Sequence, residues 1–266
     1  MILFAKISKW TGALLAVVSL SARAADTPKH VDVKPFSKVE NVVVPLPNEV
    51  FGALNKLGGV NWREYVRNDK GANFTERPRI ALLLGAVIAD GFIAVQAEDA
   101  PTVKDIGQRV LSLSKAIGVS SSITAHAKAI TDAADKRNWA SVRQELDKTQ
   151  NSVQQAMNEV HDEKLSQLVS LGGWLRGTEV LTAVVTKRYS EEGSELLHQP
   201  DLLNYFETRL QAMPEFNLKL LQDIHAALVE VRPLIDVGTA HIPPASVKKI
   251  NDITTRLGDA ITKKTP

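Results

Sequence analysis

The sequence predicts an all-α protein, a multi-helix antiparallel bundle of about seven or eight main helices around two central ones. Beyond residue 75, apolar residues recur at intervals of three and four, as they do on one face of an amphipathic helix. Two further stretches, residues 80–97 and 168–185, are apolar all round, which is typical of helices buried on every side. Connections of a few residues favour antiparallel neighbours.

The first 24 residues have the features of a secretory signal peptide. Lys6 and Lys9 precede the apolar residues 10–20, and Ala22-Arg23-Ala24 supplies small residues where a signal peptidase cleaves. The apolar run is shorter than the roughly 20 residues of a membrane-spanning helix. We therefore expect a mature chain that begins at Ala25 and lies in the periplasm or outside the cell. An uncleaved N-terminal anchor is the alternative.

Cleavage changes the charge balance. Three of the 32 basic residues leave with the signal peptide, so 29 basic residues face 30 acidic ones and the mature chain has a net charge of −1. No basic cluster predicts a nucleic-acid partner. The chain has no cysteine, which excludes both disulfides and a lipid anchor on cysteine. The mature chain must therefore be held together by its own core.

Residues 25–75 are expected to form an extended arm and two short helices. Four prolines disfavour helix in residues 26–47, where a valine-rich run can lie against the body of the protein. Asn48 and Asn61 can cap the two short helices, and a polar loop ends at Thr75.

The bundle domain is expected at residues 76–264, with its helices bounded by residues that start or stop a helix. Pro78 suits a first turn, Asp99 and Asn138 suit N-caps, and Gly118 suits the position just after a helix. Pro233 is expected to bend or end the helix that contains it. The helices expected in order are residues 77–98, 101–117, 123–137, 139–160, 165–189, 200–212, 216–235 and 247–261, with an interruption at residues 191–193.

One charged residue stands inside each of the two apolar stretches. Asp90 has apolar neighbours three and four positions away on both sides, and a lone buried carboxylate is costly, so it needs a partner or a proton. Arg176 is the matching exception in the second stretch. Small residues that would let the two backbones approach are Gly85, Ala89, Gly91, Gly172, Gly173 and Gly177. We predict that Asp90 and Arg176 form a bidentate ion pair between the two central helices.

Two interpretations of this pair remain open. In the first, it is a structural ion pair that fixes the register of the two helices. In the second, Asp90, Arg176 and Glu179 line a binding site for an anionic or polar ligand, with Arg176 as the anchor and Glu179 one turn along. Removal of one partner distinguishes the two, because a purely structural pair predicts lost stability and a ligand site predicts lost binding.

No catalytic residue, metal site or cofactor is predicted. The six histidines show neither an HExxH motif nor a pair at i and i+4, and a nucleophile elbow, a P-loop and a dinucleotide fingerprint are all missing. Covalent haem needs a CxxCH motif, which a chain without cysteine cannot have. The cluster His161-Asp162-Glu163, with Glu159, is expected to be a solvated run of charges at a helix end.

The stretch 80–97 is also long enough to span a membrane, but Asp90 at its centre argues against that role. We therefore expect no stable membrane span after signal cleavage. The sequence favours an exported, soluble, non-catalytic binding or envelope-associated module whose partner is an unknown protein or small ligand. An enzyme with a carboxylate–arginine site between the central helices, and a metal- or haem-binding bundle, are the alternatives.

Overall fold

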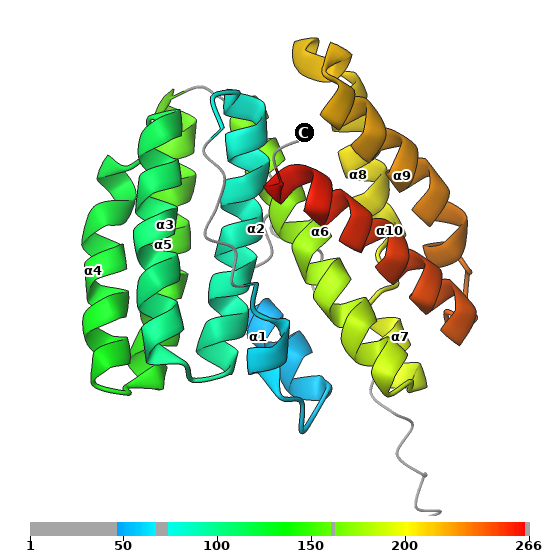
Figure 1. Cartoon of the computed structure of the whole chain (residues 1–266), viewed down its shortest axis with the longest axis horizontal. Coiled ribbons are helices and arrows are strands. Elements are labelled where there is room, and N and C mark those ends of the chain that lie inside the picture. Colours follow the sequence, from blue (N-terminus) through cyan, green and yellow to red (C-terminus); the bar gives the residue numbers. More distant parts are fainter. Residues whose placement is uncertain (1–46, 68–73, 161–162, 264–266) are drawn as a thin grey trace, which may run out of the picture. The chain divides into compact units, whose positions relative to one another are not determined.

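The computed structural model describes residues 47–67, 74–160 and 163–263 (Figure 1). The chain divides into two units, Met1–Lys34 and Pro35–Pro266, and the first lies wholly outside the described residues. The expected signal peptide and nearly all of the expected arm also lie outside the described residues. Everything below concerns the second unit.

The described residues are helical and contain no strand, which confirms the all-α bundle. In chain order the elements are α1 (Pro47–Lys56), the 3-10 helix η1 (Trp62–Tyr65), α2 (Arg77–Gln96), α3 (Ala100–Ile117), α4 (Ser121–Asp135), α5 (Trp139–Val160), α6 (Glu163–Lys187), α7 (Glu191–Glu195), α8 (Pro200–Gln211), the 3-10 helix η2 (Pro214–Asn217), α9 (Lys219–Ile235) and α10 (Pro244–Thr262).

Three expected helix boundaries are confirmed by their capping geometry, whereas Asn48 is not the N-cap of α1, because this helix already begins at Pro47. The side chains of Asp99 and Asn138 each accept a hydrogen bond from the backbone N–H three residues further on. Gly118 ends α3 with a φ of 87°, a left-handed conformation that glycine adopts without a steric penalty. Asn61 was expected to cap η1 but makes no such bond, because its side-chain amide donates to the Glu64 carboxylate instead.

One expectation about the second half of the chain is wrong. The expected interruption at residues 191–193 is a short helix, α7, which starts because the Ser190 hydroxyl accepts a hydrogen bond from the Gly193 amide. Helix α9 ends at Ile235, two residues beyond Pro233, which agrees with the expected end near that proline.

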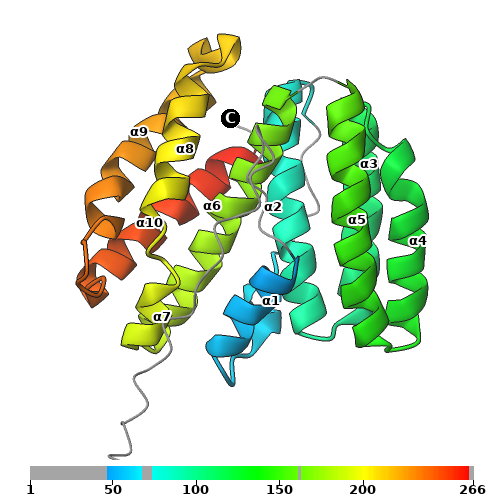
Figure 2. The same cartoon turned by 180° about the vertical axis from the view of Figure 1, so that it is seen from behind.

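The central pair, α2 and α6, lies between two groups of helices. Helix α2 packs against α3, and α4 packs against both α3 and α5, whereas α10 packs against both α6 and α9, and α9 packs against α8. Figures 1 and 2 show α3–α5 on one side of the pair and α8–α10 on the other. Successive helices from α2 to α6 reverse direction, so α2 and α6 themselves run the same way (Figure 1).

Helix α2 forms the middle of the core. It is the one helix in the described part of the chain with the length and mean hydropathy of a membrane span, yet 67% of its apolar window is buried inside the protein. Side chains on every side of it, among them Ala81, Leu82, Leu83, Leu84 and Ala94, are almost fully covered. Such all-round burial is typical of a core helix.

The two central helices cross at Gly85 and Gly172, where one backbone lies directly on the other. A Cβ atom added to Gly85 would lie 1.8 Å from the carbonyl oxygen of Val169, and one added to Gly172 would lie 2.0 Å from that of Leu82. Both distances are far below van der Waals contact, so only glycine fits at either position. The predicted close approach is confirmed at these two residues.

The other glycines that were predicted to lie at the crossing make no such close contact between α2 and α6. A Cβ on Gly173 would lie an unstrained 3.5 Å from Gly85, and one on Gly177 would meet nothing within 4 Å. Gly177 is wrong as a crossing residue because it lies about 140° around α6 from Gly172. Gly91 faces Ile106 of α3 rather than α6.

A buried charge network between the central helices

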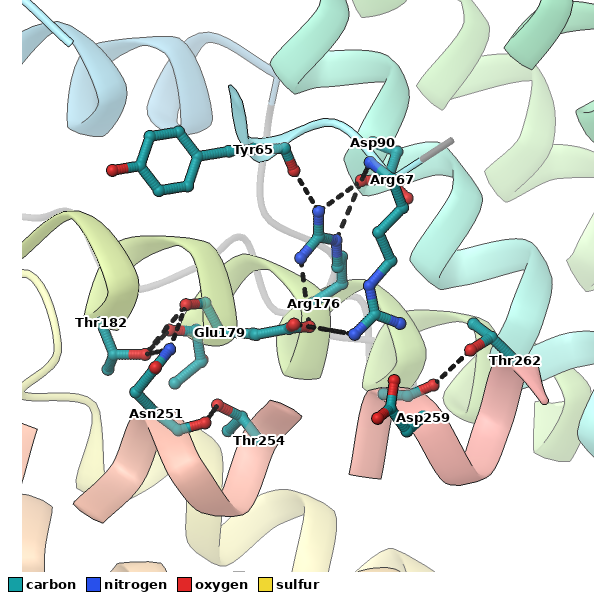
Figure 3. A network of polar contacts seen from close by, with 12 residues as sticks. Tyr65, Arg67, Asp90, Arg176, Glu179, Thr182, Asn251, Thr254, Asp259 and Thr262 are labelled. Atoms are coloured by element: carbon teal, nitrogen blue, oxygen red, sulfur yellow. Dashed lines mark hydrogen bonds and ion pairs between the residues drawn. The ribbon is translucent and has the colours of Figure 1, made fainter. Parts of the chain in front are cut away.

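Asp90 of α2 and Arg176 of α6 meet across the central pair, as the sequence predicts (Figure 3). The Arg176 Nη2 and Nε atoms lie 2.8 and 2.9 Å from the Asp90 Oδ1 atom. Each residue is only 6% exposed. The predicted bidentate geometry is wrong in one respect, since both guanidinium nitrogens bind the same carboxylate oxygen rather than one oxygen each.

Glu179 extends the pair into a network. It follows Arg176 by three residues on α6, and its Oε2 atom lies 3.1 Å from Arg176 Nη1. On its other side the Nη2 atom of Arg67 donates to both carboxylate oxygens, at 2.7 and 2.9 Å. The Glu179 carboxylate therefore lies between two guanidinium groups, and the network contains two acids and two arginines with no net charge.

The segment that follows η1 is tied to this network by its backbone as well. The Tyr65 carbonyl accepts a hydrogen bond from Arg176 Nη2, and the Arg67 amide lies 3.4 Å from Asp90 Oδ1. The two backbone groups thus form hydrogen bonds with the two buried charged side chains. Residues 65–67 hold the charged side chains from one side, and α10 approaches from another (Figure 3).

Helix α10 supplies two contacts. The Asn251 side-chain amide donates to the Glu179 carbonyl at 2.9 Å and to the Thr182 hydroxyl at 3.0 Å, which joins α10 to α6. Gly258 leaves the space that the Arg67 guanidinium occupies, because a Cβ there would lie 2.4 Å from Arg67 Nη2. The network therefore draws on α2, α6, α10 and the segment after η1.

Burial raises the pKa of the Asp90 carboxyl, and Arg176 and then Arg67 oppose that rise. The two arginines therefore favour the charged carboxylate and oppose the desolvation cost of burying it. Buried ion pairs of this kind contribute little net stability, but loss of one member leaves an uncompensated charge in the core. The geometry therefore supports the interpretation in which Asp90 and Arg176 fix the register of α2 and α6.

The sequence identified Asp90, Arg176 and Glu179 but not Arg67. A signal was present, because two acids against one arginine in the apolar helices leave one negative charge without a partner. Charge balance requires one more cationic residue near Glu179, but it does not identify that residue. Arg67 lies in a short segment of ordinary composition, and only the fold brings it to Glu179.

A second polar cluster joins α4 to α5. His126 Nδ1 lies 2.7 Å from Glu145 Oε1, and His126 Nε2 lies 2.8 Å from the Ser152 hydroxyl. Serine, histidine and acid follow one another as nucleophile, base and orienting group do in hydrolases. Ser152, however, lies within α5, whose backbone N–H groups are engaged in helical hydrogen bonds and cannot stabilise an oxyanion. We assign these contacts to helix packing.

This cluster predicts a pH dependence of stability. The hydrogen bond from His126, and secondarily the contact with Lys148, hold the pKa of Glu145 below its ordinary value. A lowered folded-state pKa contributes stability above the unfolded-state pKa, and that stability is lost as the pH falls through the folded-state value. We expect Glu145→Gln to lower stability at pH 7 by about 1 kcal/mol and to have a smaller effect near pH 3. Urea unfolding at the two pH values measures this, and an equal effect at both would contradict it.

The cluster His161-Asp162-Glu163 is only partly described. His161 and Asp162 lie outside the described residues. Among the residues that the structure does describe, no group of three His, Asp or Glu side chains is placed to hold a metal ion. Comparisons with protein-family models, with curated proteins and with solved structures each gave no match.

Proposed function

We propose that the protein is an exported, soluble, non-catalytic helical bundle that acts as a binding or envelope-associated module. Its location would be the periplasm or the extracellular space, and its partner an unknown protein or small ligand. The observation that supports a non-catalytic role is the closure of the buried charge network. Asp90, Arg176 and Glu179, the residues best suited to chemistry, are engaged with one another and with Arg67.

Export is supported by the N-terminal sequence. Two lysines, a short apolar run and Ala22-Arg23-Ala24 follow one another as in a cleaved signal peptide. Asp90 in α2 is paired inside the protein, which supports a core role for this apolar helix rather than a membrane span after cleavage.

The two alternatives gain no specific support from the described contacts. A ligand anchored on Arg176 would have to displace Asp90, Glu179 and the Tyr65 carbonyl together. A metal- or haem-binding role finds no contact in the described residues that favours it.

Export is tested by expressing the full chain in a Gram-negative host and measuring its location and intact mass. We expect a periplasmic protein whose mass corresponds to a chain starting at Ala25. Ala24→Arg is the matched control, because a large charged residue at the cleavage position should leave the precursor uncut. A wild-type chain that stays in the membrane fraction with residues 1–24 attached would contradict the proposal.

Binding is tested by hydrogen exchange of the mature protein in buffer and in periplasmic extract of its own host. A binding module predicts one contiguous surface that exchanges more slowly in the extract. Unchanged exchange in every peptide would contradict a binding role in that compartment. The Asp90→Ala variant serves as the control, since its global loss of protection differs from protection of a surface.

A further inference from the structure

The contact between Glu179 and Arg67 differs from the rest of the charge network in how well it is made. Arg67 uses a single nitrogen, Nη2, for both carboxylate oxygens. Its other terminal nitrogen, Nη1, is buried and has no hydrogen-bond partner among the residues that the structure describes. A guanidinium group binds a carboxylate best through two parallel N–H···O bonds, one nitrogen to each oxygen. The short backbone path from η1 thus places Arg67 at Glu179 in a geometry poorer than a free guanidinium could adopt.

The site itself is shaped for a guanidinium group. Gly258 on α10 leaves room for the planar group, and a side chain at that position would collide with Arg67 Nη2, Cζ and Nη1, all within 2.9 Å of an added Cβ. Glu179 is held from behind by Arg176 through the 3.1 Å contact to its Oε2 atom. The carboxylate therefore stays in place whether or not Arg67 is there.

Arg67 is the replaceable member of the network. Its side chain is 17% exposed, against 6% for that of Arg176, and among the described residues its guanidinium forms hydrogen bonds with Glu179 only. When Arg67 is withdrawn, Asp90, Glu179 and Arg176 remain. These three side chains have a net charge of −1. An anion would be repelled there, whereas a cation would restore neutrality.

We propose that Glu179, Gly258 and the neighbouring Arg176 form a guanidinium-binding site that the chain fills with its own Arg67. A monoalkylguanidinium, the group that ends every arginine side chain, takes the place of Arg67 when Arg67 is absent or displaced. The site and its ligand do not depend on the export or binding role proposed above.

The experiment compares wild type with Arg67→Ala and uses ethylguanidinium as the probe. Thermal unfolding is followed at millimolar probe concentrations, with ethylammonium as the control because it has the same charge but no planar fork. We expect the probe to raise the unfolding temperature of Arg67→Ala with an apparent Kd of about 1–10 mM. Wild type should show no rise, because its site is already filled. Ethylammonium should act at least tenfold more weakly on the variant.

Two double variants locate the effect. Arg67→Ala combined with Glu179→Gln removes the carboxylate charge and should abolish the response to ethylguanidinium. Arg67→Ala combined with Gly258→Ala fills the space from α10 and should abolish it too; the three atoms nearest to the added Cβ all belong to the Arg67 side chain, which this double variant lacks. Responses that are equal in all variants, or absent from Arg67→Ala, would overturn the proposal.

If Arg67→Ala does not fold alone, the readout becomes the refolding yield after dilution from urea. Recovery of folded protein with ethylguanidinium but not with ethylammonium supports the site. Recovery with neither, or equally with both, overturns it.

Discussion

Gly172→Ala is expected to destabilise the protein by at least about 3 kcal/mol, a large effect for the addition of one methyl group. The added Cβ would lie 2.0 Å from the Leu82 carbonyl oxygen and 2.9 Å from the Leu82 Cα atom. Both are backbone atoms of α2, so no change of side-chain rotamer relieves the clash. The two central helices must move apart, which disrupts packing along their length. Urea unfolding of the purified variant measures the loss.

Gly177→Ala is the matched control for this substitution. It places the same substitution on the same helix, but at this position an added Cβ meets nothing within 4 Å. Alanine is favoured over glycine in a helix interior, so we expect this variant to be more stable than wild type by up to about 1 kcal/mol. Equal destabilisation by the two substitutions would contradict a crossing at Gly172.

Asp90→Ala is expected to cost about 3–5 kcal/mol, because it leaves the buried network with one positive charge too many. The charge of Arg176 would then be balanced by Glu179 alone, which it already shares with Arg67. Asp223→Ala on α9 is a suitable control, since this exposed carboxylate pairs with Lys219 on its own helix and with no other residue in the described part of the chain. That change should stay within about 0.5 kcal/mol of wild type.

The stability of the Asp90→Ala variant also distinguishes the structural ion pair from the ligand-binding site. A large loss of stability supports an ion pair that fixes register. A folded Asp90→Ala protein of nearly normal stability that has lost the binding of a ligand would support a ligand site instead.

The ion pair between the central helices could be predicted from the sequence because each of two apolar helices contains one charged residue, and the two charges are opposite. Asp90 and Arg176 each stand alone in an apolar helix, and each requires the other's charge. The glycines of the second stretch do not share one direction. Rotation of about 100° per residue separates Gly172, on the face toward α2, from Gly177.

Arg67 shows where sequence reasoning stops. The requirement for a second cation near Glu179 follows from charge balance, but the choice of Arg67 depends on the path of the chain between η1 and α2. The short helix α7 also escapes sequence reasoning, because it starts with a local hydrogen bond from the Gly193 amide to the Ser190 hydroxyl that composition does not reveal.

The join between α2 and α6 is tested most directly by a double-mutant cycle of Asp90→Ala and Arg176→Ala, measured by urea unfolding. Direct pairing in the core predicts that the double variant loses much less stability than the two single variants combined, with a coupling energy of about 1.5–3 kcal/mol. Additive effects, with coupling below about 0.5 kcal/mol, would show that the two residues do not meet and would contradict the central helix pair described above.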